Sequence, residues 1–139
     1  MTLETILAGG QQITGHRPFP CIVVDVPAWQ DAADLLATGA LTLLSLWGET
    51  GRVHMAVLQD APFGIAVLSL ECSDKRYPSV GRVHPPALRL ERTARDLFGL
   101  EPIDLPDRRP WLDHGRWGDS PPPAYDFLPV TGASLHQIP

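Results

Sequence analysis

The stretch LTLLSLWGETGRVHMAVLQDAPFGIAVLSLEC, residues 41–72, decides the fold of this chain. Three of its runs are strand-like, residues 41–47, 52–59 and 64–72. The segments GETG and DAPF between them have the composition of tight turns. In the middle run, Val53, Met55 and Val57 alternate with residues of the other side, so one side faces a core. The stretch therefore predicts an antiparallel meander with a buried face.

A strand and a helix are predicted upstream of the meander. The run CIVVDV, residues 21–26, is rich in β-branched residues and flanked by prolines, which is typical of a buried strand. In PAWQDAADLLATG, residues 27–39, apolar residues recur at helical spacing, with proline at the start and Gly39 at the C-terminal cap position. With a second helix after the meander, this order predicts an α+β fold, an antiparallel or mixed sheet covered by helices and related to the split βαβ arrangement.

The composition changes after Glu101. Eight of the fifteen prolines lie beyond this residue, four of them in SPPPAYDFLP. A segment of this kind does not build a core of its own. We therefore expect two parts, an α+β domain over residues 1–101 and an extended proline-rich docking or linker tail over residues 102–139.

Composition and charge exclude several classes of function. The chain has 139 residues, of which 44% are hydrophobic, and this suits one globular core. A formal net charge of -5 makes nucleic acid an unsuitable partner. The longest apolar runs have about half the length that spans a bilayer, and the N-terminus lacks the features of a signal peptide. We expect a cytoplasmic chain without a membrane span.

The cysteines and histidines do not suggest a metal site. Cys21 and Cys72 lie far apart and are predicted to be free, buried thiols. The five histidines are scattered, and none has a second ligand at a useful spacing. We expect no metal and no cofactor in this chain.

Acidic groups and a histidine gather at one place, Asp104, Asp107, Asp113 and His114. General acid–base chemistry needs such a cluster, but arginines are interleaved with it, and ion pairing explains it better. A free-standing small enzyme or ligand-binding module that uses Asp107, Asp113 and His114 is the alternative function, and it predicts a closed pocket around these residues.

The most patterned segment is LRLERTARDLFGL, residues 88–100. An apolar stripe along the predicted helix consists of Ala87, Leu90, Ala94, Leu97 and Phe98. Two pairs of opposite charge, Glu91–Arg95 and Arg92–Asp96, are spaced one turn apart. Exposed pairs of this kind contribute only a few tenths of a kcal/mol, roughly, so a solvated face would account for them.

Residues 77–112, YPSVGRVHPPALRLERTARDLFGLEPIDLPDRRPWL, resemble the signature region of the 30-kDa subunit of respiratory NADH:quinone oxidoreductase. They also resemble the N-terminal domain of membrane-bound group 4 nickel–iron hydrogenases of the hydrogenase-4 or formate hydrogenlyase type. The matching positions are Pro78, Ser79, Val80, Glu91, Arg92, Asp96, Phe98, Gly99, Pro106, Asp107, Arg108 and Arg109. The family's second Glu is Thr93 here, and its His before Pro-Asp is Leu105.

The end of the chain favours the hydrogenase branch of this resemblance. The segment YDFLPVTGASLHQIP, residues 125–139, resembles the segment that leads into the large, nickel-site subunit of the group 4 hydrogenases. The usual Pro-Leu-Arg-Lys-Asp segment of the respiratory subunit is absent.

The resemblance implies a non-catalytic assembly or docking subunit that binds the large subunit, 49-kDa-like or nickel–iron, of a complex I-like oxidoreductase. It implies no cofactor in this chain, with nickel–iron, iron–sulfur or quinone sites in partner subunits, and a peripheral place on the cytoplasmic face of the inner membrane. We expect Glu91 to receive a bidentate guanidinium from Arg108 or Arg109, which would fix the Pro106–Arg109 loop to the helix.

The aromatic residues near the C-terminus have two interpretations of equal weight. They fold back on the domain, or they are anchors in a groove of a partner. The residues expected to dock on a partner, or to shape the docking motif, are Glu91, Arg92, Asp96, Phe98, Gly99, Pro106, Asp107, Arg108, Arg109, Trp111, Trp117, Tyr125 and Phe127.

Overall fold

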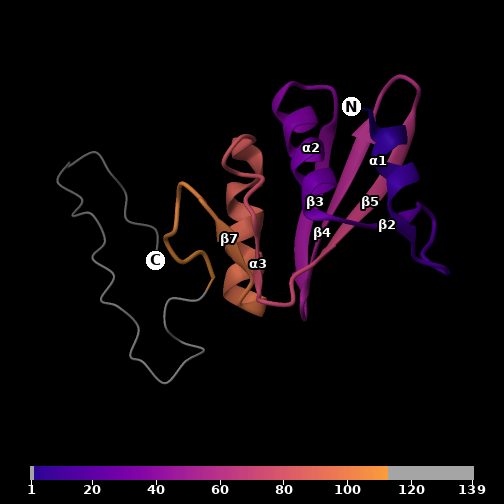
Figure 1. Cartoon of the computed structure of the whole chain (residues 1–139). Coiled ribbons are helices and arrows are strands. Elements are labelled where there is room, and N and C mark those ends of the chain that lie inside the picture. Colours follow the sequence, from indigo (N-terminus) through magenta and orange to yellow (C-terminus); the bar gives the residue numbers. More distant parts are fainter. Residues whose placement is uncertain (1, 113–139) are drawn as a thin grey trace, which may run out of the picture.

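A mixed five-stranded sheet forms the centre of the protein (Figure 1). The structure is a computed structural model that describes residues 2–112. The strands are β1 (Gln11–Gln12), β2 (Cys21–Val24), β3 (Thr42–Glu49), β4 (Arg52–Gln59) and β5 (Gly64–Glu71). Their order across the sheet is β1-β2-β5-β4-β3. The three strands of the meander are antiparallel, and β2 runs parallel to β5, so the predicted α+β fold with a split βαβ arrangement is confirmed.

The turns of the meander follow the predicted turn segments. Glu49 pairs with Arg52, which leaves two residues in the turn between β3 and β4. One of them, Gly51, has a φ of 76°, a left-handed conformation that glycine adopts without steric cost. Because this turn fixes the register, Val53, Met55 and Val57 all point to the same side of the sheet and are fully buried there.

Helix α2 (Val26–Ala37) covers that buried face of the sheet. Asp25 is its N-cap, with a side-chain oxygen that accepts a hydrogen bond from the Ala28 N–H at 2.9 Å, and a proline lies in the first turn. The predicted apolar side of this helix is confirmed, since Trp29, Ala32, Ala33 and Leu36 are buried. The helix thus begins and packs as the sequence predicts.

The face of β4 opposite Val53, Met55 and Val57 is also partly covered, although the alternation of the sequence predicts only one buried face. His54 is buried and stacks on Trp47 with 5.3 Å between the ring centroids. Its Nδ1 lies 2.6 Å from the hydroxyl of Ser69, and its Nε2 lies 3.3 Å from a carboxylate oxygen of Glu49. Burial lowers the pKa of His54, and the nearby Glu49 opposes this shift.

Several short elements were not predicted from the sequence. They are the helix α1 (Leu3–Gly9), the strands β1, β6 (Arg76–Pro78) and β7 (Glu101–Ile103), and a 3-10 turn at Pro85–Ala87. Strands β6 and β7 pair in parallel as a separate two-stranded sheet. The expected division between residues 101 and 102 therefore falls inside β7. The expected tail from residue 113 onward lies outside the described residues.

Helix α3 (Leu88–Phe98) packs beside β3, at the opposite end of the sheet from α1 (Figure 1). The predicted apolar stripe is wrong in part. Ala87 and Ala94 are buried, but Leu97 and Phe98 are 49% and 39% exposed, and Glu91 is fully buried instead. Glu91 can be buried because its carboxylate has hydrogen-bond donors in the interior. No helix within residues 2–112 is long and apolar enough to cross a membrane.

A buried hydroxyl provides a test of the packing between α2 and β6. Tyr77 is 1% exposed, its ring meets that of Trp29 edge to face, and within residues 2–112 its hydroxyl has no hydrogen-bond partner. We expect Tyr77→Phe to raise the free energy of unfolding by about 1 kcal/mol, because an unsatisfied polar group is removed. Guanidinium denaturation of the full chain measures this change.

Trp29→Phe is the matched control for Tyr77→Phe. The Trp29 indole N–H donates to the carbonyl of Pro78 at 3.0 Å, so this variant loses a satisfied hydrogen bond and leaves a void. We expect it to lower the free energy of unfolding by about 2 kcal/mol. If Tyr77→Phe also lowered the free energy of unfolding, the Tyr77 hydroxyl would have a hydrogen-bond partner, contrary to this structure.

Candidate functional site

The site that the signature residues define is built on α3. Glu91 in the first turn of this helix faces inward, towards the turn that follows β6. Its carboxylate accepts hydrogen bonds from the Ser79 hydroxyl at 2.8 Å, the Val80 N–H at 2.8 Å and the Gly81 N–H at 2.9 Å. A Cβ atom on Gly81 would lie 2.7 Å from the carboxylate, so only glycine allows this approach.

The predicted partner of Glu91 is therefore wrong. Neither Arg108 nor Arg109 reaches it, because both guanidiniums are largely exposed on the loop and pair elsewhere. Arg108 pairs with Glu101, and Arg109 pairs with Asp107. Glu91 does not pair with Arg95 either, since the buried carboxylate is bound by the residues of the turn.

Burial is the main influence on the Glu91 carboxyl group. It raises the pKa of Glu91 above its ordinary value of 4.5, and the three donors from residues 79–81 oppose that shift. The balance of the two effects leaves the pKa raised. Glu91 is thus a structural carboxyl group that joins α3 to the turn after β6.

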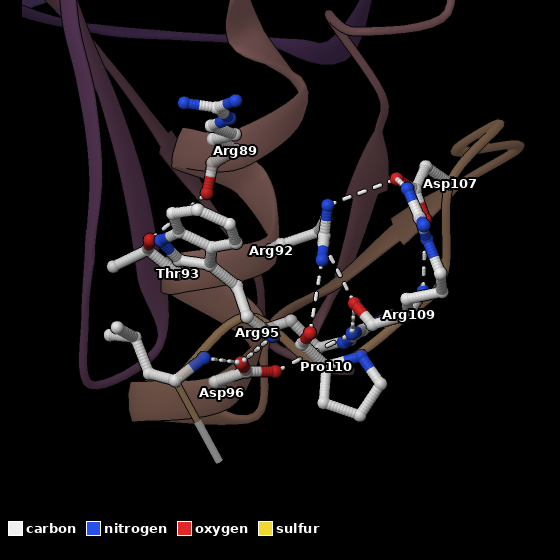
Figure 2. Close-up of polar contacts among 10 residues, drawn as sticks. Arg89, Arg92, Thr93, Arg95, Asp96, Asp107, Arg109 and Pro110 are labelled. Atoms are coloured by element: carbon white, nitrogen blue, oxygen red, sulfur yellow. Dashed lines mark hydrogen bonds and ion pairs between the residues drawn. The ribbon is translucent and has the colours of Figure 1, made fainter. Parts of the chain in front are cut away.

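Arg92 fixes the loop at residues 104–112 to α3 (Figure 2). Its Nε donates to the carbonyl of Arg109 at 2.7 Å, and Nη2 donates to the carbonyl of Pro110 at 2.9 Å. Its Nη1 lies 2.9 Å from the Asp107 carboxylate. The Arg92 side chain is 8% exposed, and its planar guanidinium suits this set of three acceptors better than an ammonium group would. The loop is thus held to the helix, as predicted, but by Arg92.

The last turn of α3 binds the same loop a few residues further on. One carboxylate oxygen of Asp96 accepts the backbone N–H groups of Trp111 and Leu112, both at 2.7 Å. The Arg95 guanidinium donates to the carbonyl of Arg109 at 3.0 Å and also pairs with Asp96 (Figure 2). The helix ends at Gly99, whose φ of 66° is the left-handed conformation of a C-terminal cap.

Asp107 is an ion-pair residue and not a proton donor. The Arg109 side chain and backbone N–H, together with Arg92, hold the pKa of Asp107 well below its usual range. That shift keeps the Asp107 carboxyl group ionised at neutral pH, which does not suit a general acid. A groove of about 430 Å³ lies between α2 and the turn after β6, and Asp107 does not line it. Asp113 and His114, the other members of the alternative catalytic cluster, lie outside the described residues.

Four large apolar side chains stay partly exposed around the end of α3 and the loop, Leu97, Phe98, Trp111 and Leu112. The Trp111 ring, 40% exposed, lies with the guanidinium carbons of Arg89 and Arg92 at 5.0 and 5.2 Å from its centroid. Pro106 is exposed on the same loop. Trp117, Tyr125 and Phe127 lie outside the described residues, so their two interpretations stay open.

Sequence reasoning did not single out Arg89, Leu97 or Leu112 for this surface. The spacing Arg89–Arg92, three residues on a helix, was the available signal for the two guanidiniums that meet Trp111. Within residues 2–112 no group of His, Cys, Asp and Glu can hold a metal ion. Both cysteines are free and buried, as predicted, and burial raises the pKa of Cys72 to about 11.

Two solved structures share this fold. A trypsin-resistant fragment of Nqo5 is similar with a TM-score of 0.61 and 21% identity, over 76% of this chain and 95% of that chain. A chain of the membrane-bound sulfane sulfur reductase, an archaeal respiratory membrane complex, is similar with a TM-score of 0.51 and 16% identity, over 73% of this chain and 68% of that chain. None of the curated proteins matches. The likeness to Nqo5 defines the class of fold.

The family model described as the 30-kDa subunit of respiratory-chain NADH dehydrogenase matches residues 22–131. The chain belongs to this family, as the signature residues predicted. The match covers the sheet except β1 and the first residue of β2, both large helices and the loop that Arg92 holds.

Replacing the buried carboxylate tests the role of Glu91. In Glu91→Gln an amide –NH₂ faces a hydrogen-bond donor of the turn, so we expect the free energy of unfolding to fall by about 2 kcal/mol near pH 5. Between 4.5 and the raised pKa the folded chain binds more protons than the unfolded chain, so wild-type stability falls as the pH rises through this window.

The difference in free energy of unfolding between the wild type and Glu91→Gln should therefore be largest near pH 4.5 and become smaller as the pH rises. Chemical denaturation of both proteins between pH 4.5 and 7.5 measures it. A difference that widens with pH would mean that the folded-state pKa is depressed, contrary to the burial described above.

The fork of Arg92 is tested by a change that keeps its charge. Arg92→Lys removes at least one of the contacts to Arg109, Pro110 and Asp107, so the loop should open more often. We expect the N–H groups of Trp111 and Leu112 to exchange about tenfold faster with solvent, as hydrogen-exchange measurements would show. Arg82→Lys, at an exposed position outside this contact, is the control and should leave both rates unchanged.

Proposed function

We propose that this chain is a non-catalytic docking subunit or domain of a complex I-like oxidoreductase and binds the large subunit of that complex. The large subunit would be of the 49-kDa-like or the nickel–iron type, and the nickel–iron, iron–sulfur or quinone sites would belong to partner subunits. The membership in the 30-kDa subunit family supports this proposal. The assembled chain would lie peripherally on the cytoplasmic face of the inner membrane.

One observation carries the proposal: the loop at residues 104–112 is ordered by α3 while its apolar side chains face outward. Arg92, Arg95 and Asp96 bind backbone groups at residues 109–112. A loop that is already ordered loses little conformational entropy when it binds. The exposed residues Trp111 and Leu112 lie on this prepared loop, with Leu97 and Phe98 at the end of α3.

The chemistry of this surface favours a protein partner over a small substrate. Aromatic side chains beside arginine are enriched at the centres of protein interfaces. The charged groups of the motif are engaged within the chain, so they do not form an open reactive cluster. We define the docking surface as Leu97, Phe98, Trp111 and Leu112 together with the arginines that contact Trp111.

Within the family we favour the group 4 nickel–iron hydrogenase branch over the NADH:quinone oxidoreductase branch. The residues that support it are those of YDFLPVTGASLHQIP, residues 125–139, with their likeness to the segment that leads into the hydrogenase large subunit. The chain of the membrane-bound sulfane sulfur reductase, an archaeal respiratory membrane complex, has a similar fold. Sequencing the source gene beyond residue 139 would test this choice. A following large-subunit sequence with paired CxxC motifs would support the hydrogenase branch, and one without these cysteines would support a quinone-reducing relative.

Removing the Trp111 side chain tests the docking surface. We expect Trp111→Ala in the full chain to weaken binding to the purified large subunit by about 30-fold or more, because an interface aromatic anchor contributes on the order of 2 kcal/mol. Calorimetry or surface plasmon resonance measures the affinity.

Phe63→Ala is the matched control for Trp111→Ala. Phe63 is an aromatic residue that is 76% exposed in the turn between β4 and β5, away from α3. The Phe63→Ala variant should bind the purified large subunit with unchanged affinity. Equal affinities for the wild type and Trp111→Ala would rule out this surface, and no binding by the wild type would rule out the proposed function.

A further inference from the structure

Arg89 differs from the other arginines of the docking surface and its loop. Arg92, Arg95, Arg108 and Arg109 each bind a carboxylate of the chain, and the first two also bind backbone carbonyls. The exposed Arg89 guanidinium has no ion pair and no hydrogen bond within the part of the chain that the structure describes. Within the described residues the guanidinium makes a cation–π contact with the Trp111 ring, with 5.0 Å between the guanidinium carbon and the ring centroid.

Four carboxylates near this surface, among residues 2–112, are already engaged. Asp96 binds the loop N–H groups, Glu101 binds Arg108, and Asp107 binds Arg92 and Arg109. Glu91 is buried on the other side of the helix, with its own donors. Within the described residues, this surface therefore offers a partner an apolar area with one guanidinium, that of Arg89, that has no acceptor.

Docking would place that guanidinium in the interface. A partner that covers the exposed part of Trp111 also covers Arg89, because the two groups are in contact. Burying an unpaired charge is strongly unfavourable, so the partner has to supply an acceptor. A guanidinium that lies over an aromatic ring keeps N–H groups at its edge, where a carboxylate binds in bidentate fashion.

We propose that Arg89 determines partner specificity by pairing with an aspartate or glutamate of the large subunit, next to the apolar site that receives Trp111. This inference rests on the proposed function and names the chemistry of the partner surface. A lone unpaired arginine beside apolar side chains suits a single carboxylate on a protein. Anionic lipid headgroups are bound by clusters of several basic residues, and Arg108 and Arg109 are already neutralised here.

The test measures the affinity of the full chain for the purified large subunit at low and high salt. Arg89→Glu should weaken binding at least about tenfold at low salt, with a smaller difference at high salt, because a like charge then faces the partner carboxylate. Arg89→Lys keeps the positive charge but lacks the planar guanidinium, so its affinity should lie between those of Arg89→Glu and the wild type. Arg82→Glu makes the same change of charge at another exposed arginine and should have little effect.

A charge reversal on the partner identifies the paired residue. Changing each surface aspartate or glutamate of the large subunit to lysine should yield one variant that restores binding to Arg89→Glu. Affinities that are equal for Arg89→Glu and Arg82→Glu would overturn the role of Arg89. If the wild type then still binds and Trp111→Ala does not, the proposed function stands without this inference.

Two further results separate the remaining possibilities. No binding of the wild type to the large subunit would overturn both the proposed function and the role of Arg89. Binding of the wild type to vesicles of phosphatidylglycerol that is lost in Arg89→Glu but kept in Arg82→Glu would also overturn the inference, since the acceptor would then be a lipid headgroup. We expect no such binding.

Discussion

The hydrogen-bonded carboxylate of Glu91 is the interaction on which the second half of the described chain depends. It joins α3 to the turn at residues 79–81 through two backbone N–H groups and the Ser79 hydroxyl. That turn directly follows β6, and β6 pairs with β7, so the same contact sets the position of both short strands relative to the helix. A buried carboxyl group is unfavourable unless its hydrogen bonds are satisfied, and this geometry satisfies them. Glu91 therefore specifies one arrangement of the turn and α3.

The residue after Glu91 extends the arrangement to a second side of the helix. Arg92 turns outward to the loop, and Arg95 and Asp96 one turn later bind the same loop. Helix α3 thus lies between two segments without regular structure and fixes both through polar contacts. This explains why so many charges occur on a short helix, because each of these side chains has a defined acceptor or donor off the helix. An exposed helix face with pairs one turn apart would not need such specific partners.

The sequence was sufficient for the regular parts of the fold and insufficient for the polar contacts. The alternation in residues 52–59 and the helical spacing of Trp29, Ala32, Ala33 and Leu36 depend on side-chain burial, so the patterns are visible in the sequence. The partners of Glu91 and Arg92 are mostly backbone N–H and carbonyl groups, and every residue type carries these. No pattern distinguishes residues 80, 81, 109 and 110 as such partners. Leu97 lies about 120° around the helix from Glu91, so burying Glu91 turns Leu97 away from the core. Phe98 lies on the same face as Glu91 and is partly exposed at the end of the helix.

Two of the departures from the family pattern, Thr93 and Leu105, have defined contacts in the described structure. The Thr93 hydroxyl donates to the Arg89 carbonyl at 2.9 Å, so it is satisfied within the helix. Leu105 is 5% exposed, and its Cδ1 would lie 3.3 Å from a Cβ atom on Gly81, beside the Glu91 carboxylate. An apolar residue there excludes water from the carboxyl group, in the same sense as the burial that raises its pKa. A charged histidine would stabilise the ionised form instead, so Leu105 makes the turn depend on its neutral hydrogen-bond donors, the Ser79 hydroxyl and two backbone N–H groups.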